Sequence, residues 1–102
     1  MAVNLEFKLH DHVGTFAANG TLGDQLRRQE IEPHWEKADK IVLNFVGVSS
    51  MTDSFVNAFI GNLVEGHPAD FKSKLRFVNC SPLVTTFIKG ALQFASKRMS
   101  HA

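Results

Sequence analysis

The sequence has 102 residues, of which 44% are hydrophobic and 21% charged, with a formal net charge of +1 at pH 7. This length is typical of one domain with one hydrophobic core, and we expect a single domain over residues 1–102. Eleven basic residues against ten acidic ones give no field strong enough to attract nucleic acid or an anionic membrane. The composition therefore argues against a nucleic-acid-binding or membrane-binding protein.

The cysteine content and the hydropathy indicate a compartment. Cys80 is the only cysteine, so neither an intramolecular disulfide nor a multi-cysteine metal site can form. The first residues have no basic segment followed by an apolar one. The longest apolar-rich run, residues 41–48, is far shorter than the ~20 residues that span a bilayer. We therefore expect a cytoplasmic protein that has no contact with a membrane.

The chain begins with a predicted strand. Leu5, Phe7 and Leu9 alternate with polar residues, which is the pattern of a strand with one face buried and one face in water. Residues 12–16 are a candidate for a second, short strand before the turn dipeptide at 19–20. Because its outer face is polar, we expect the first strand to lie near an edge of the sheet.

A helix is predicted to follow Gly20. Residues 21–24 resemble a capping box, and apolar residues keep helical spacing on one side, while Arg27 is expected to point outward. Pro33 cannot continue this helix undisturbed. We therefore expect a bend there, followed by a short helical segment that carries Trp35.

The middle of the chain predicts a strand and a long helix. Residues 41–46 form a continuous run of branched and aromatic side chains, which predicts a central strand covered on most of both faces. Residues 55–64 carry a broad apolar stripe at helical spacing, and Gly66, His67 and Pro68 should end that helix.

The last part of the chain predicts one more strand and one more helix. The strand is expected over residues 75–79, and Ser81 followed by proline is a typical helix start, with the serine as N-cap. On that helix the buried side is expected to consist of Leu83, Phe87 and Ala91, flanked by Val84, Ile88, Leu92 and Phe94. Because strands alternate with helices, the fold class is predicted to be α/β with a partly parallel sheet.

Three potential metal ligands stand together at His10, Asp11 and His12. In a strand the two imidazoles point to one side and the carboxylate to the other, which leaves two ligands where a stable zinc site needs three or four. We therefore interpret these residues as solvated edge residues and expect no metal. His67 is interpreted as a cation near a helix end, where it relieves the helix dipole.

The sequence lacks the usual signatures of enzymes. There is no Gly-x-Ser-x-Gly elbow, no histidine placed as its base, and neither of the glycine-rich phosphate-binding loops. We therefore expect no enzymatic activity and no cofactor. Cys80, which precedes a predicted helix, could be a reactive thiol or a small buried side chain, and we favour the second interpretation.

One polar cluster exceeds what the local structure needs. Ser49, Ser50, Thr52, Asp53 and Ser54 lie between the predicted central strand and the following helix. We call residues 49–54 the corner. Capping needs one or two such residues, either Ser50 with Asp53 or Thr52 alone. A phosphoryl group on Ser54 would lie in the positive field of the helix start but beside a carboxylate, which favours a switchable state.

The corner carries a resemblance to a known family. Residues 41–55, which include Phe45-Val-Gly-Val and Thr52-Asp-Ser-Phe, resemble the signature of STAS domains, the fold of sulphate transporters and anti-sigma-factor antagonists. They are still more similar to the STAS-like family of bacterial and phage proteins known as DUF4325. Residues 76–79 also fit the sequence pattern of that family. The resemblance covers residues 20–95 and implies a mixed sheet of four to five strands with helices mainly on one face.

The resemblance also implies a function. STAS antagonists bind an ATPase of the anti-sigma type, which phosphorylates a serine in an Asp-Ser-Ser-Gly stretch at this corner. Ser54 stands at the position of that serine, whereas Thr52, Asp53 and Phe55 replace the other three residues. The implied protein is a non-enzymatic regulatory module that binds a protein partner, an ATPase or serine kinase, through residues 49–54.

Three alternatives stay open from the sequence. The first is a sensor of a small molecule or nucleotide, with a groove between the first helix and the corner. The second is a hydrolase with Ser54 as nucleophile. The third is a homo-oligomer that forms through the exposed edge of the first strand.

Overall fold

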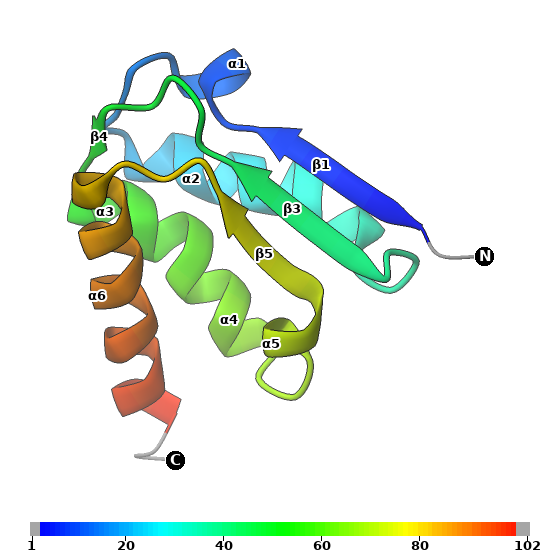
Figure 1. Ribbon diagram of the computed structural model, residues 1–102. Coiled ribbons are helices and arrows are strands. Elements are labelled where there is room, and N and C mark those ends of the chain that lie inside the picture. Colours follow the sequence, from blue (N-terminus) through cyan, green and yellow to red (C-terminus); the bar gives the residue numbers. More distant parts are fainter. Residues whose placement is uncertain (1–2, 100–102) are drawn as a thin grey trace.

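The computed structural model describes residues 3–99. Its main sheet has three parallel strands in the order β1-β3-β5, formed by Asn4–Lys8, Lys40–Asn44 and Leu75–Val78. Figure 1 shows these strands side by side, with the helices behind one face and the carboxyl ends of all three strands at the same end of the molecule. The α/β class and the helices on one face agree with the prediction.

The remaining elements connect and cover these strands. They are α1 (His10–Val13), β2 (Phe16–Ala17), α2 (Gly20–Leu26), the π-helix η1 (Arg27–Ile31), the 3-10 helix η2 (Glu32–His34), β4 (Ser50–Met51), α3 (Asp53–Val56), the π-helix η3 (Asn57–Gly61), α4 (Asn62–Gly66), α5 (Phe71–Lys74) and α6 (Pro82–Met99). The elements α3, η3 and α4 form one continuous helical run, as the apolar stripe over 55–64 predicted. No helix among residues 3–99 is long and apolar enough to cross a membrane.

The predicted sheet of four to five strands is wrong. The described residues form a sheet of three strands and a separate sheet of two, in which β2 and β4 are parallel, with Phe16 opposite Ser50 and Ala17 opposite Met51. Both short strands turn away from the main sheet. A glycine with a positive φ precedes each of them, Gly14 (69°) and Gly47 (82°), and such backbone is favourable for glycine.

The second strand predicted over 12–16 is also wrong in its first half, because residues 10–13 form the single helical turn α1. The amide of Val13 donates to the carbonyl of Leu9 (2.9 Å), and Leu9 is fully buried. The side chain at position 9 thus anchors the turn in the core. A period-two pattern cannot distinguish such an anchor from the end of a strand.

The central strand β3 is covered on one face only. Ile41 and Leu43 are fully buried beneath the helices, whereas Val42 is partly exposed on the opposite face. The strand was predicted to be covered on most of both faces, and none of its residues is exposed, but every long helix of the described chain lies on the same side of the sheet (Figure 1).

Helix α2 begins where the sequence predicted, but with a different cap. The side chain of Asn19 accepts hydrogen bonds from the amides of Thr21 (2.8 Å) and Leu22 (3.3 Å), so the predicted capping box over 21–24 is wrong. As predicted, the α-helix does not continue through Pro33, which lies in the 3-10 turn η2. Trp35 follows it and is buried.

Helix α6 starts as predicted but buries a different stripe. The Ser81 hydroxyl accepts from the amide of Val84 (3.1 Å), which confirms the N-cap. Leu83 is 49% exposed, and of the three residues predicted at the centre of the buried side only Ala91 is buried, whereas the flanking Val84 and Ile88 are buried as predicted. The side chains of α6 that are buried belong to the adjacent stripe, which packs against the helical run 53–66: Val84, Ile88, Ala91 and Ala95.

Two glycines in helices should respond in opposite ways to alanine. A Cβ on Gly23 would lie 2.9 Å from the carbonyl oxygen of Phe55, whereas a Cβ on Gly90 would meet no atom within 4 Å. We expect Gly23→Ala to lower the free energy of unfolding by about 1.5 kcal/mol, because α2 must move away from α3. Gly90→Ala should raise it by about 0.7 kcal/mol, since alanine is the better helix former. Urea unfolding measures both, and equal effects would contradict this packing.

Candidate functional site

The corner lies at the end of the molecule where the carboxyl ends of the parallel strands meet (Figure 1). It contains strand β4 and the first turn of α3. In open sheets of parallel strands this end is the usual place for a binding site, since loops there are free to vary while the strands hold them in position. The predicted site residues 49–54 therefore fall where this architecture favours function.

One of the predicted site residues has a structural role. The Thr52 hydroxyl accepts from the amide of Phe55 (3.2 Å) and donates to the carbonyl of Ala18 (2.9 Å). Thr52 is therefore the N-cap of α3, and it also fastens that helix to the segment between β2 and α2. The alternative capping box between Ser50 and Asp53 does not form.

The other polar residues of the corner are available to a partner. Ser49, Asp53 and Ser54 are exposed and Ser50 is partly exposed. Within residues 3–99, the three serine hydroxyls have no hydrogen-bond partner and the Asp53 carboxylate has no ion pair. These four side chains thus form a polar rim whose hydrogen-bonding capacity the fold leaves unused.

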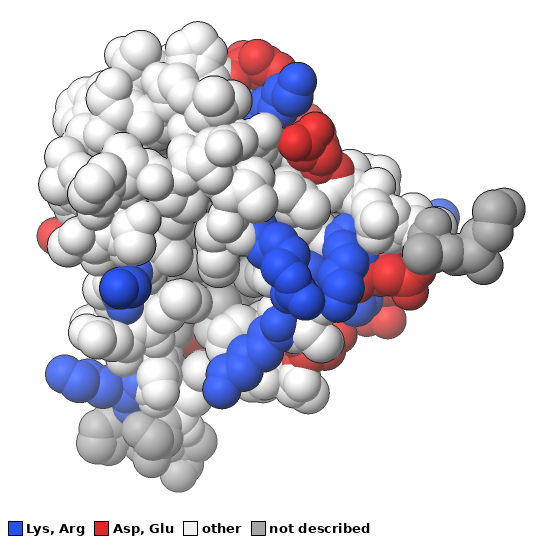
Figure 2. Space-filling view, in the orientation of Figure 1, with Lys and Arg blue, Asp and Glu red and all other residues white. Residues whose placement is uncertain are grey.

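The surface around this rim is apolar and nearly free of charge. Figure 2 shows the end of the molecule above the sheet with almost no lysine, arginine, aspartate or glutamate on the side in view. Phe16 in β2 is 55% exposed and Val46 in the loop after β3 is 52% exposed. A hollow of about 550 Å³ adjoins Ser49, lined by residues 45–49 and 79–81. Large apolar side chains at the surface beside unbonded polar ones are typical of a protein-binding surface.

Phe16 and Val46 were not recognised in the sequence as site residues. Both stand in short apolar segments that were interpreted as strands, and a pattern of apolar residues normally indicates burial. The only signal was the glycine near each of them, since Gly14 and Gly47 interrupt the apolar runs. Such an interruption brings the neighbouring side chain into a loop, where it can be exposed.

The two backbones of α2 and α3 meet directly at the corner. A Cβ on Gly20 would lie 3.2 Å from the carbonyl oxygen of Ser54, and one on Gly23 would lie 2.9 Å from that of Phe55. A groove between the first helix and the corner, which the sensor hypothesis requires, is therefore closed at these residues. The contact fixes the direction in which the first turn of α3 presents Ser54.

His10, Asp11 and His12 are exposed, as predicted, but they lie in α1 and not at a strand edge, so that part of the interpretation was wrong. The ring of His10 lies against Gly47, 2.9 Å from where a Cβ would be, and the ring of His12 stacks on Phe7 with 4.6 Å between centroids. No group of three or more potential ligands that could hold a metal ion occurs in the described range 3–99. His10 therefore contacts the loop that leads into the corner.

Cys80 lies beside the corner and is partly buried. Burial raises the pKa of this thiol above 9.0, because the thiolate is the form that loses hydration. At pH 8 a smaller fraction of Cys80 than of a free thiol is thiolate, the form that reacts. We expect iodoacetamide to modify the folded protein more slowly than it modifies the unfolded chain in urea at the same pH. Equal rates would contradict this assignment, and a faster reaction of the folded protein would indicate an activated cysteine.

Comparison with known proteins gives a family. The profile of the family described as "STAS-like domain of unknown function (DUF4325)" matches residues 23–85, which is more than half of the chain. The chain therefore belongs to this STAS-like family, as the sequence resemblance predicted. Neither a curated protein nor a solved structure shows a significant match.

Proposed function

We propose that this STAS-like domain is a non-enzymatic regulatory module that binds a protein partner through the corner. The observation that carries the proposal is the set of unbonded side chains at Ser49, Ser50, Asp53 and Ser54, which border the exposed apolar residues Phe16 and Val46. Apolar side chains supply the contact area of an interface, and hydroxyls at its rim supply directed hydrogen bonds.

The geometry around the serines favours binding over catalysis. A catalytic serine needs a base within hydrogen-bond reach. Among residues 3–99 the hydroxyls of Ser49, Ser50 and Ser54 have neither a histidine nor a carboxylate at that distance. The nearby His10 ring instead packs on the glycine of the loop. These hydroxyls are therefore proposed to bind a partner protein and not to catalyse a reaction.

Ser54 is the residue through which the corner would be regulated. It lies on the first turn of α3, at the start of a helical run that continues to Gly66, and its side chain is exposed. A phosphoryl group there would add a charge of about −2 to a surface with few charges, beside the carboxylate of Asp53. A partner that binds the neutral surface would then have to desolvate this charge, so phosphorylation should release it.

The partner we propose is an ATPase of the anti-sigma serine-kinase type. The test is to mix the full chain with such an ATPase and to measure affinity by calorimetry without ATP, and intact mass after ATP is added. We expect Val46→Asp to weaken binding at least tenfold, because it places a charge on the apolar surface. The matched control is Val3→Asp, an equally exposed valine (51%) outside the corner.

The phosphorylation step has its own outcome. We expect ATP to increase the mass of the wild-type chain by one phosphoryl group and to leave Ser54→Ala unmodified, while Ser96→Ala, an exposed serine on α6, is modified normally. Binding without a change in mass would contradict regulation by phosphorylation of Ser54 but would still support a protein-binding module. If Val46→Asp and Val3→Asp bind equally well, the corner is not the partner surface.

A further inference from the structure

A second surface, separate from the corner, lies between the edge of the main sheet and α6. Helix α6 packs mainly against the helical run 53–66. Two hollows lie on its side toward residues 68–80. One of about 400 Å³ is lined by Phe71, Leu92 and Met99, and one of about 290 Å³ is lined by Phe77, Ile88 and the same Leu92.

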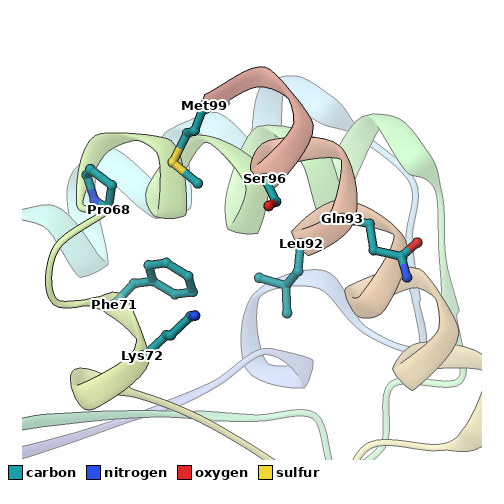
Figure 3. Close-up of a pocket in the computed structure, with 7 residues that line it drawn as sticks. All are labelled: Pro68, Phe71, Lys72, Leu92, Gln93, Ser96 and Met99. Atoms are coloured by element: carbon teal, nitrogen blue, oxygen red, sulfur yellow. The ribbon is translucent and has the colours of Figure 1, made fainter. Parts of the chain in front are cut away.

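The two hollows form one groove with an apolar floor. In Figure 3 the side chains of Phe71 and Leu92 point toward each other from opposite sides, and the thioether of Met99 lies at the end of the hollow. Phe71, Phe77, Leu92 and Met99 are all partly exposed. Because Leu92 belongs to both hollows, an extended ligand could follow the groove from one to the other.

One wall of this groove is a strand edge without a partner. Strand β5 pairs with β3 on one side, and no strand among residues 3–99 pairs with its other side. The carbonyl of Val78 accepts from the amide of Phe45 (3.0 Å), so it faces β3. Successive residues of a strand direct their backbone groups to alternate sides. The amide and carbonyl of Phe77 therefore face the open side, where they can pair with an added strand.

The charge around the groove selects one kind of ligand. Helix α6 has no aspartate or glutamate, and its Arg98 pairs with Glu65 (Nε to Oε1, 3.2 Å). Lys72 and Lys89 line the two hollows, and within the described residues neither ammonium group has an ion pair. The groove is thus apolar at its floor and positively charged at its rim.

We propose that this groove binds an extended acidic segment of a partner protein, which adds as a strand to the free edge of β5. Backbone hydrogen bonds to Phe77 would hold the segment, and its apolar side chains on the α6 side would enter the hollows. Acidic residues at the two ends of the segment would pair with Lys72 and Lys89, which line the hollows. This surface does not include residues 49–54, so it stands independently of the function proposed for the corner.

The first test uses designed peptides with the full, unmodified chain. The probes are a hexapeptide with glutamate at both ends and valine between them, and its counterpart with lysine in place of glutamate, each titrated into isotopically labelled protein. We expect the acidic peptide to shift amide resonances of β5 and of residues 85–96, and the basic peptide to bind at least tenfold more weakly. Two N-methylated forms of the acidic peptide carry the methyl groups on alternate sets of backbone amides. They should differ in affinity, since only one of the two sets faces β5 and donates hydrogen bonds to it.

Charge-reversing variants form the second test. Lys72→Glu and Lys89→Glu should each weaken binding of the acidic peptide by about fivefold. The matched control is Lys37→Glu, an exposed lysine in the turn before β3, which should leave the affinity unchanged. The proposal is overturned by an absence of shifts at millimolar peptide, by equal binding of the two N-methylated forms, or by shifts confined to residues 49–54. A chain that sediments as a dimer with the Phe77 amide already protected would also overturn it, because a second copy would then be the ligand.

Discussion

Trp35→Ala is expected to lower the free energy of unfolding by about 4 kcal/mol. The indole of Trp35 is 1% exposed and stacks on His67 with 4.0 Å between ring centroids. Its Nε1 donates to the carboxylate of Asp70 (3.1 Å), and the Lys74 ammonium lies 5.4 Å from the ring centroid. The side chain thus joins the segment after η2 to the turn between α4 and α5. Alanine would leave a large cavity and would remove the hydrogen bond to Asp70, whose carboxylate would keep only its pair with Lys74 (3.9 Å).

Trp35→Phe is the matched control for this variant. Phenylalanine keeps an aromatic ring against His67 and removes the indole hydrogen bond, so we expect a loss of about 1.5 kcal/mol. Because Trp35 is the only tryptophan, fluorescence cannot follow both proteins, and urea unfolding should be followed by circular dichroism. A loss below 1 kcal/mol for Trp35→Ala would show that this indole does not hold the two segments together.

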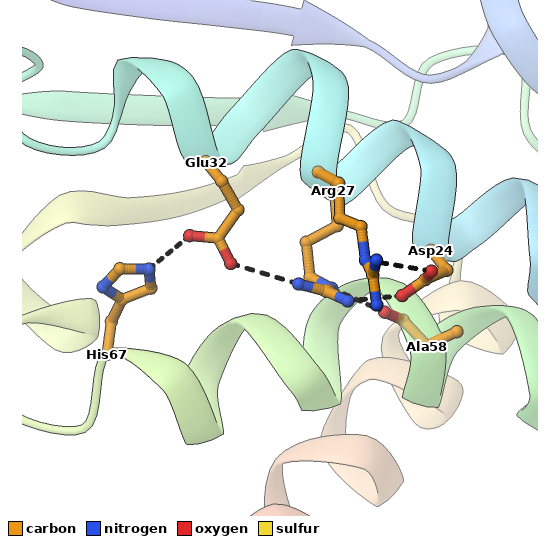
Figure 4. Close-up of polar contacts among 6 residues, drawn as sticks. Asp24, Arg27, Glu32, Ala58 and His67 are labelled. Atoms are coloured by element: carbon orange, nitrogen blue, oxygen red, sulfur yellow. Dashed lines mark hydrogen bonds and ion pairs between the residues drawn. The ribbon is translucent and has the colours of Figure 1, made fainter.

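Arg27→Ala is expected to lower the free energy of unfolding by about 3 kcal/mol. Figure 4 shows the guanidinium of Arg27 between two carboxylates, where it pairs with Asp24 and Glu32 and donates to the carbonyl of Ala58. Only 11% of its side chain is exposed. Glu32 in turn bonds the His67 imidazole (2.5 Å). Without Arg27, Asp24 would keep only its pair with the exposed Arg28 and Glu32 only its bond to His67, and η1 would lose its hydrogen bond to Ala58 in the helical run 53–66.

Arg28→Ala gives a closely matched comparison, since Arg28 pairs with the same aspartate (Nε to Oδ2, 3.1 Å) while 70% of its side chain is exposed. Water screens that pair, so we expect a change within about 0.5 kcal/mol. Thermal unfolding at low and at 0.5 M salt should separate the two arginines further, because salt weakens exposed pairs more than buried ones. Equal losses for Arg27→Ala and Arg28→Ala would contradict the role of the buried network.

The sequence predicted the positions of the helices and strands better than it predicted which of their faces are buried. The continuous run at 41–46, the stripe at 55–64 and the serine cap at Ser81 are local signals, and each corresponds to an element of the structure. Helix α6, however, has two neighbouring apolar stripes, and either of them could face the core. The stripe with small alanines lies against the core, because Ala91 and Ala95 let another helix approach closely. Periodicity alone does not contain that choice.

The features that could not be predicted from the sequence depend on contacts between residues far apart in the chain. Arg27 was predicted to point outward because charged residues normally face water, but two carboxylates and a carbonyl bring it inside. The exposure of Ser49 and Ser54 was predicted, since the corner has more polar residues than capping needs. The use of Thr52 as the cap depends on its bond to Ala18, which is 34 positions away in sequence.

Hydrogen–deuterium exchange of the full chain, alone and saturated with the ATPase partner, tests the proposed function most directly. If the corner is the partner surface, amides of residues 46–54 exchange more slowly in the complex, while those of residues 85–96 beside the α6 groove are unchanged. If a partner is bound and the exchange of residues 46–54 stays the same, the unbonded serines of the corner are not its binding site, and the proposal is wrong.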